Sequence, residues 1–318
     1  EWVRPAHGGT NENSRITYKA APGEEVILKG SEMITDWKEL EEGVWTRTFN
    51  LDFFGDFNPY TVFVQDGMLP GEERNRCRGQ VYLNGVPLVE VDAPKDVKYE
   101  HTWSTGYGPD HVPANSVSGD DFSYTYTPNV EELTIYAHFG SLNPNRQRVE
   151  IYTREQVFAP AEWNLGYISV NGLIIMHSAN DRGHGFHISG RANQKGALST
   201  TGGHHWIIEN CIVSQTKSMG LDFGLQGADT QTRNGRPEIY GYHIIRNNLF
   251  KDTGGNGIIA WESPFNSIYG NTFINCDRLK YMPRGSAGAI KLIGEKEDDL
   301  IYDNYFYNNY LFDIFIDG

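Results

Sequence analysis

Basic residues are in short supply in this chain, which has 27 lysines and arginines against 41 aspartates and glutamates and a formal net charge of -14. A surface with that balance repels phosphate groups, so neither nucleic acid nor a membrane surface is an expected partner. Long apolar runs are missing too: the chain has no stretch of about 20 apolar residues, which is the length needed to span a bilayer. No signal peptide is visible, although the chain opens at Glu1 without a methionine, and the location stays open among the bacterial cytoplasm, the periplasm and the medium.

Cysteine is also scarce. The chain has Cys77, Cys211 and Cys276, an odd number without metal-type spacing, which predicts neither a disulfide framework nor a metal site. Cys211 and Cys276 lie beside apolar strands and are interpreted as small core residues. These patterns require no cofactor.

Helical periodicity is absent from the second half of the chain, where a short phrase recurs instead. Each copy is a short apolar strand, an Asn and a further apolar pair, and successive copies are roughly 20–45 residues apart. Repetition at that period is typical of architectures whose units stack to bury a shared core. The copies are Ile168–Leu173, Ile207–Ile212, Ile244–Leu249, Ile268–Phe273 and Ile301–Phe306.

These strands alternate in polarity and are rich in Ile, Tyr and Phe, which predicts an all-β chain folded as a right-handed parallel β-helix. Asn suits the corner between strands because it tolerates left-handed backbone and bonds local backbone groups. We therefore expect the asparagines of the phrase to stack as a ladder inside the corner. They are Asn171, Asn210, Asn247, Asn271 and Asn304. The alternative is a set of unrelated Asn-bearing turns.

The phrase is interrupted near the start of the chain. Residues 1–30 are assigned to the first coil, because 15–30 contains two strand patterns around a Pro-Gly turn. Over 31–157 the phrase is absent, and short strands rich in Trp, Tyr and Thr alternate with turns, which predicts an inserted β-sandwich. Within it, Asn84-Gly85 is a type I′ hairpin signal. The β-helix is expected to occupy 158–318.

Several segments in chain order resemble glycoside hydrolase family 120. The most specific is Phe-Phe-Gly-Asp-Phe-Asn-Pro-Tyr at 53–60. The others are Glu1–Pro5, Arg15–Ala20, Lys29–Glu32, Val81–Gly85, Trp206–Asn210 and His243–Asn248. The resemblance implies a retaining β-xylosidase built as a parallel β-helix interrupted by a β-sandwich, with an oligosaccharide or polysaccharide substrate.

Carboxylates recur on one outward face of the predicted coils. The strands after the Asn corners are aligned with Leu221, Ile259, Ile290 and Ile314 facing inward. Alternation then turns four charged side chains outward on one face. These are Asp222, Glu262, Lys291 and Asp317. Glu262 and Asp317 lie two coils apart, roughly 9–10 Å, so the three carboxylates are candidate catalytic residues and Lys291 a candidate substrate-binding residue.

The resemblance also implies roles. In the family the nucleophile is an Asp at the end of a coil strand, and the acid/base is a Glu one coil later. Residues 311–317 match the nucleophile strand, which makes Asp317 the nucleophile and places the partner Glu beyond Gly318. A second register, in which 305–309 matches the next coil, makes Asp317 the acid/base. In either register the β-helix is expected to be truncated at its C-terminal end.

Other candidate substrate contacts lie in loops. Residues 283–293 retain the Ala-Gly and Ile-Lys-Leu of the family and include Arg284, but Ile293 stands where the family has a His, so xylose specificity stays open. His184 and His187 belong to a histidine-rich span with His177, His204 and His205. We interpret this span as sugar-contacting or structural, with a metal site as the alternative. The cleft is expected between loops 225–240 and 277–288.

Two other function classes fit a β-helix. A polysaccharide lyase would use Lys291 as the base and Ca²⁺ or basic residues to neutralise a uronate carboxylate, but basic residues are rare on the predicted face. A non-catalytic glycan-binding protein predicts outward aromatic residues instead of stacked carboxylates. Oligomer formation stays open.

Overall fold

The computed structural model describes residues 1–62, 64, 77–91, 93–97, 123–128, 131–181, 195–225, 239–279, 288–294 and 298–317. The described chain contains no α-helix; its regular elements are strands and three short 3-10 helices, η1 (Leu51–Phe54), η2 (Pro94–Asp96) and η3 (Pro144–Arg146). It divides into two compact units, one built from Glu1–Gly30 and Glu155–Gly318 and the other from Ser31–Val64 and Gly71–Arg154. No helix within these ranges has the length and apolarity needed to cross a membrane.

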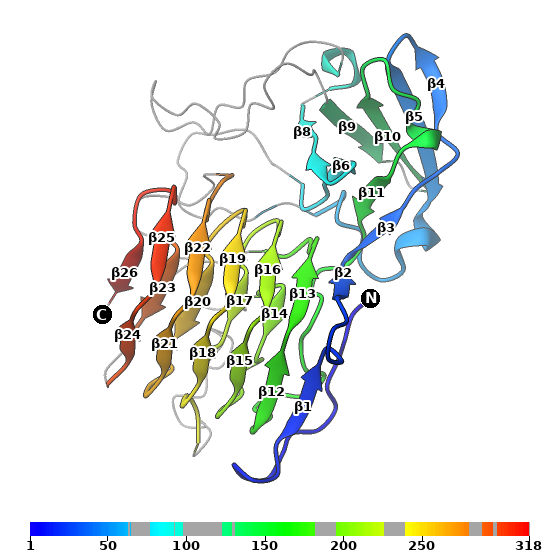
Figure 1. The fold of residues 1–318 in the computed structure, drawn as a ribbon. Coiled ribbons are helices and arrows are strands. Elements are labelled where there is room, and N and C mark those ends of the chain that lie inside the picture. Colours follow the sequence, from blue (N-terminus) through cyan, green and yellow to red (C-terminus); the bar gives the residue numbers. More distant parts are fainter. Residues whose placement is uncertain are drawn as a thin grey trace. The chain divides into compact units, whose positions relative to one another are not determined.

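The first unit is a parallel β-helix with three sheets, and each coil from β12 onward adds one strand to each sheet (Figure 1). The first sheet contains β1 (Ile16–Lys19), β12 (Ile168–Asn171), β15 (Ile207–Glu209), β18 (Ile244–Arg246), β21 (Ser267–Tyr269) and β24 (Leu300–Tyr302). The second contains β2 (Val26–Lys29), β13 (Leu173–Met176), β16 (Ile212–Ser214), β19 (Leu249–Lys251), β22 (Thr272–Ile274) and β25 (Tyr305–Tyr307). The third contains β14 (Leu198–Ser199), β17 (Leu221–Asp222), β20 (Ile258–Trp261), β23 (Ile290–Ile293) and β26 (Ile314–Asp317).

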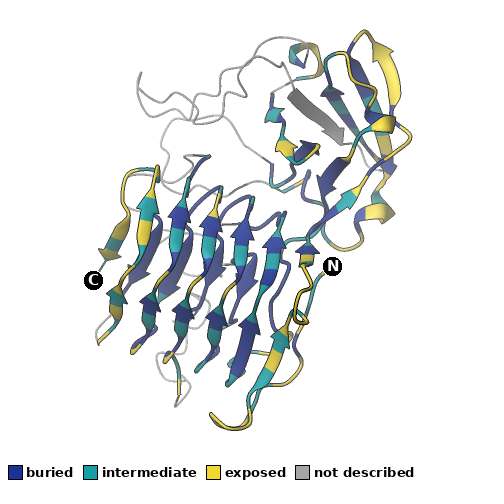
Figure 2. Ribbon diagram, in the orientation of Figure 1, coloured by how far each residue is buried: buried dark blue, intermediate teal, exposed yellow. Residues whose placement is uncertain are grey.

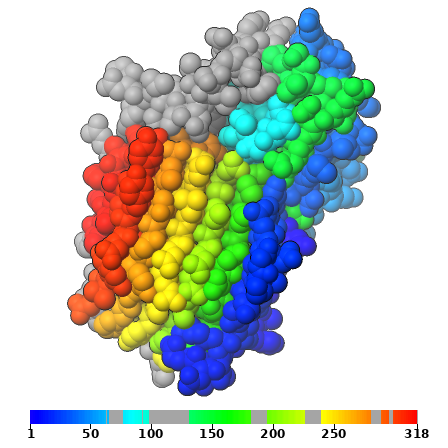
Figure 3. Space-filling view, in the orientation of Figure 1, coloured from blue at the N-terminus to red at the C-terminus, as the bar shows by residue number. Residues whose placement is uncertain are grey.

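Stacking of like side chains holds the coils together. All neighbouring strands in the three sheets run parallel, so equivalent residues lie one strand spacing apart. Inside the coils, Phe250, Phe273 and Phe306 stack with ring centroids 5.0 and 5.1 Å apart. Figure 2 shows the buried interior, and Figure 3 shows successive coils as adjacent bands of colour. The predicted β-helix with an inserted domain is confirmed.

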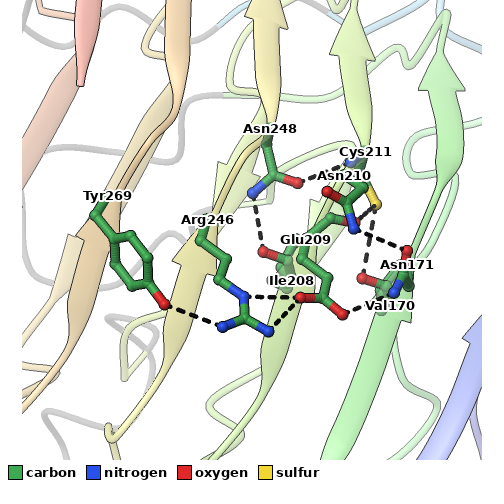
Figure 4. A network of polar contacts seen from close by, with 9 residues as sticks. All are labelled: Val170, Asn171, Ile208, Glu209, Asn210, Cys211, Arg246, Asn248 and Tyr269. Atoms are coloured by element: carbon green, nitrogen blue, oxygen red, sulfur yellow. Dashed lines mark hydrogen bonds and ion pairs between the residues drawn. The ribbon is translucent and has the colours of Figure 1, made fainter. Parts of the chain in front are cut away.

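The Asn ladder exists, but in the second and third copies of the phrase the ladder position lies one residue later than expected. Strand pairing aligns Asn248 with Asn271 and Asn304. Asn271 Oδ1 accepts from Asn248 N–H at 3.0 Å, and Asn304 Oδ1 accepts from Asn271 N–H at 3.0 Å. Cys211 fills the preceding position, where its N–H donates to Asn248 Oδ1 at 2.9 Å (Figure 4).

Asn171, Asn210 and Asn247 therefore do not belong to this ladder. Asn210 and Asn247 precede the ladder positions and have positive φ angles of 55° and 56°, so they form the left-handed corner itself. Asn171 ends β12, and its side chain donates to Glu209 Oε1 at 2.7 Å on the outer face. The match on Asn is off by one residue because the fourth and fifth copies have Gly270 and Asp303 at the position where the second and third have Asn210 and Asn247.

A second corner has its own column of acceptors. Trp206 N–H donates to His243 Nδ1 at 3.2 Å, and His243 N–H donates to Asn266 Oδ1 at 2.9 Å. Asn266 N–H in turn donates to Asp299 Oδ1 at 2.7 Å. Residues of different chemistry thus fill one structural role, which hides this column from a search for repeated letters.

The second unit is a β-sandwich. Its five-stranded sheet contains β4 (Lys38–Glu41), β5 (Val44–Asn50), β10 (Glu132–His138), β9 (Ser123–Pro128) and β8 (Val89–Glu90). Its four-stranded sheet contains β3 (Ser31–Met33), β11 (Val149–Tyr152), β6 (Val81–Leu83) and β7 (Val86–Pro87). Both sheets contribute to one apolar core. Asn84 and Gly85, at φ 52° and 85°, turn the β6–β7 hairpin as expected for type I′.

Candidate active site

The third sheet of the β-helix carries the predicted catalytic residues. Leu221, Ile258, Ile290 and Ile314 share one row, and Asp222, Ile259, Lys291 and Phe315 share the next. The prediction that Ile259 faces inward is wrong: Ile258 is in the core and Ile259 is in a separate cluster with Met219 and Ile293. A slip of one residue moves a whole strand to the other face, and it displaces Glu262 from the row of Asp317.

Three outward side chains of this sheet are buried, although they lie outside the coil core. Ile259, Lys291 and Ile293 are at most 8% exposed. The buried charged residues among the described part of the first unit all lie on this sheet or on the segments that lead into it from the second sheet. They are Asp181, Lys217, Asp222, Asp277, Arg278 and Lys291. Burying charge is costly unless it is paired, so this concentration of charge on one flank is typical of a functional site.

Lys291 and Asp317 form an ion pair on adjacent strands. Lys291 Nζ donates to Asp317 Oδ2 at 3.0 Å, and the lysine side chain is 3% exposed whereas that of Asp317 is 45% exposed. The pair geometry follows from the register, because Lys291 pairs with Phe315 and Ile293 with Asp317. One carboxylate therefore faces solvent while a buried ammonium holds it from behind.

Asp222 is placed differently. It is fully buried, and its Oδ1 accepts from Gly196 N–H while its Oδ2 accepts from Ser199 O–H at 2.8 Å. These bonds fasten the start of β14 to β17. Asp222 therefore positions this strand, and its predicted catalytic role stays a prediction.

Glu262 leaves β20 at a left-handed corner. Its φ is 48°, and its N–H donates to Ile293 O at 2.8 Å. A Cβ placed on Gly294 would lie 3.1 Å from Glu262 Cγ, so the glutamate side chain lies over that glycine. Trp261, Ile293 and Asp317 are in line across three strands, which puts the coil of Glu262 two strand spacings, about 9–10 Å, from that of Asp317.

Three predicted substrate contacts lie outside the described residues. These are Arg284, His184 and His187, together with most of the loops 225–240 and 277–288. The predicted cleft between those loops therefore stays a prediction.

The described histidines do not gather at one point. His177 bonds Gln215 Oε1 through Nε2 at 2.9 Å, at the corner that follows the second sheet. His204 and His205 lie before β15, with their Nδ1 atoms 3.0 Å apart. Burial, and then the charge of His205, lowers the pKa of His204. Within the described ranges no group of three or more His, Cys, Asp or Glu side chains is arranged to hold a metal.

Sequence reasoning missed four residues of this region. Lys217, Asp277 and Arg278 are buried charges that follow corner residues, where charged residues normally face solvent, so no local pattern distinguishes them. Phe315 could have been found, since it lies two residues before Asp317 in β26 and therefore projects from the same outward face.

Comparison with known proteins agrees with this architecture. Residues 34–151 match the family model of the glycoside hydrolase 120 insertion domain. A solved structure of XylC in complex with xylose has 28% sequence identity and a TM-score of 0.85, over 99% of this chain and 56% of the XylC chain. This chain thus spans little more than half the length of XylC. No protein of curated function matches in sequence. The chain therefore resembles glycoside hydrolase family 120, in sequence across its inserted domain and in fold across nearly all of its length.

Proposed function

We propose that this chain is part of a glycoside hydrolase that cleaves the terminal sugar of xylose- or arabinose-containing glycans. The observation that carries the proposal is the half-exposed Asp317 carboxylate, which is bound to the buried Lys291 ammonium at 3.0 Å. Support comes from the inserted domain of glycoside hydrolase 120 type and from the likeness in fold to XylC, which was solved with xylose.

Asp317 is proposed as the nucleophile of a retaining reaction. One Asp317 oxygen would bond to the anomeric carbon while the bond from that carbon to the leaving oxygen breaks, and a second carboxyl would protonate the leaving oxygen. The second carboxyl, now ionised, would then take a proton from water while the water oxygen bonds to the anomeric carbon, and the bond to Asp317 breaks with its electron pair returning to the carboxylate. The ion pair with Lys291 Nζ holds the Asp317 carboxylate in place for this attack.

The spacing of the carboxylates distinguishes two versions of the mechanism. Retaining enzymes have carboxyl groups about 5–5.5 Å apart, whereas inverting enzymes have them about 6.5–9.5 Å apart. The backbones that carry Asp317 and Glu262 are two strand spacings apart, but the Glu262 side chain lies over Gly294, on the coil between them. The proposed retaining reaction needs a second carboxyl about 5–5.5 Å from Asp317, and the anomer that is released distinguishes the two versions.

The test uses the full-length protein with nitrophenyl glycosides. Asp317→Asn keeps the shape and removes the charge, so we expect kcat to fall at least about 1,000-fold while the Tm stays within about 2 °C. NMR of the first anomer released should show retention, and Glu262→Gln should keep most of the activity. Full activity in Asp317→Asn would contradict the nucleophile assignment. Inversion, together with an inactive Glu262→Gln, would identify Glu262 as the partner.

The lyase alternative is less consistent with the geometry. A lysine that acts as a base must lose its proton and reach the substrate. Lys291 donates to the Asp317 carboxylate, and its side chain is almost fully buried, so it is not placed to reach a substrate. Uronate polymers are the check, since lyase products contain an unsaturated sugar that absorbs near 235 nm.

A further inference from the structure

We infer that Phe315 is a positioning residue for the proposed reaction: its ring holds the Lys291 ammonium against the Asp317 carboxylate. The inference rests on the proposed function for its catalytic consequence, but the contact itself is independent of it. Lys291 Nζ lies 3.8 Å from the centroid of the Phe315 ring and 3.0 Å from Asp317 Oδ2.

The register explains why these three residues meet. Lys291 and Phe315 are direct partners on β23 and β26, so both project from the same outer face. Asp317 is two residues further along β26 and projects from that face as well. The Phe315 ring thus lies beside the Lys291 side chain, and Asp317 accepts a hydrogen bond from its terminal Nζ. Behind Phe315, the ring of Phe312 stacks at a centroid distance of 5.2 Å.

The environment of Lys291 makes the ring contact important. On the opposite side of Lys291, its partner on β20 is Ile259, which is buried. The Lys291 side chain is 3% exposed, so its ammonium has lost most of its water, and a cation over an aromatic face is stabilised most when it is desolvated. A flexible four-carbon stem has many rotamers, so a ring on one side and a carboxylate at the end restrict Lys291 to one of them.

The test compares three variants of the full-length protein. Phe315→Leu keeps an apolar side chain but removes the π face, Phe315→Tyr keeps the ring, and Tyr302→Leu removes a stacked ring from another sheet of the same coil. With a nitrophenyl glycoside, we expect Phe315→Leu to lower kcat about 3- to 30-fold, with a change in KM below about twofold. Phe315→Tyr and Tyr302→Leu should behave as the original protein does.

A second measurement does not depend on turnover. Acetic anhydride labels exposed lysines, and mass spectrometry of the peptide that contains Lys291 gives its labelling rate. We expect slow labelling in the original protein, Phe315→Tyr and Tyr302→Leu, and labelling several-fold faster in Phe315→Leu.

The two measurements separate the inference from the proposed function. If no variant hydrolyses any glycoside but Phe315→Leu accelerates Lys291 labelling, the proposed function fails and the contact between Phe315 and Lys291 stands. If Phe315→Leu changes neither kcat nor the labelling rate, the inference is overturned. An equal loss of kcat in Tyr302→Leu would also overturn it, because the effect would then be a general loss of stability.

Discussion

Single residues at the corners decide how the coils stack. Asn271 is 1% exposed; its Oδ1 accepts from Asn248 N–H at 3.0 Å and its Nδ2 donates to Ile245 O at 2.8 Å. One side chain thus satisfies a buried donor and a buried acceptor of the coil before it. Leaving both without a partner costs more than the bonds contribute to stability.

Asn271→Ala should therefore lower the free energy of unfolding by about 2–4 kcal/mol. Asn247→Gly is the matched control, because Asn247 is an exposed corner residue at positive φ, a conformation that glycine also adopts. Its effect should stay below about 1 kcal/mol. Urea unfolding followed by circular dichroism measures both values, and equal effects at the two positions would contradict the corrected ladder.

His243 makes the same kind of corner sensitive to pH. It is fully buried, and burial, followed by the charges of His204 and His205, lowers its pKa to about 3. Below pH 6.5 the unfolded chain binds a proton at this histidine that the folded chain rejects, so the contribution of His243 to stability falls as the pH falls from 6.5 toward 3.

His243→Asn should remove this acid sensitivity, because Asn can still accept from Trp206 N–H as Asn266 does from His243 N–H. Between pH 7 and pH 5 we expect the variant to lose on the order of 2 kcal/mol less stability than the original protein. Urea titrations at the two pH values test this, with the exposed His7→Asn as the control. Parallel losses in all three proteins would exclude a role for His243.

At the scale of elements, β14 depends on a neighbouring side chain. This strand has two residues, pairs with β17 and is held by the two bonds that Asp222 accepts. Backbone bonds join this strand to both neighbouring coils, since Leu198 N–H donates to Gly220 O at 3.1 Å and Ser199 N–H donates to Phe158 O at 2.9 Å. The carboxylate adds two side-chain bonds to this ladder.

Asp222→Ala should loosen residues 195–199 and lower the free energy of unfolding by about 2–4 kcal/mol, since it leaves buried donors without an acceptor. Ser199→Ala removes one of the two bonds and should have a smaller effect. Hydrogen exchange of the peptide that contains 195–199 should be faster in both variants, in that order. Unchanged exchange with lost activity would instead favour a chemical role for Asp222.

At the scale of the whole molecule, the chain has two separate cores. The β-helix core includes Phe158, Trp206 and Phe250, and the sandwich core includes Trp37, Phe54 and Tyr60. The ends of the sandwich are adjacent within that unit, because Ser31 on β3 pairs with Tyr152 on β11.

A chain with residues 31–154 alone should therefore fold, since its ends meet and its core is its own. We expect a single cooperative urea transition and dispersed amide NMR signals. Trp37→Ala, which removes a buried core side chain, should unfold this fragment or lower its stability by about 3–5 kcal/mol. A disordered spectrum of the unaltered fragment would contradict independent folding.

The sequence by itself determined the architecture. Alternating apolar strands and a recurring corner phrase specify a coil, because every coil must bury the same kind of residue, and the missing phrase after residue 30 marks the inserted sandwich. It also brought Lys291 and Asp317 to one face. The tertiary structure alone decided the register: Asn248 instead of Asn247 in the ladder, and Ile258 instead of Ile259 in the core. The alternating sequence of a single strand fits either register equally well, and only the hydrogen bonds to the next coil determine which register forms. The burial of Lys217 and Asp277 could not be predicted from the sequence either, because a charged residue beside a corner is buried only when the rest of the fold surrounds it.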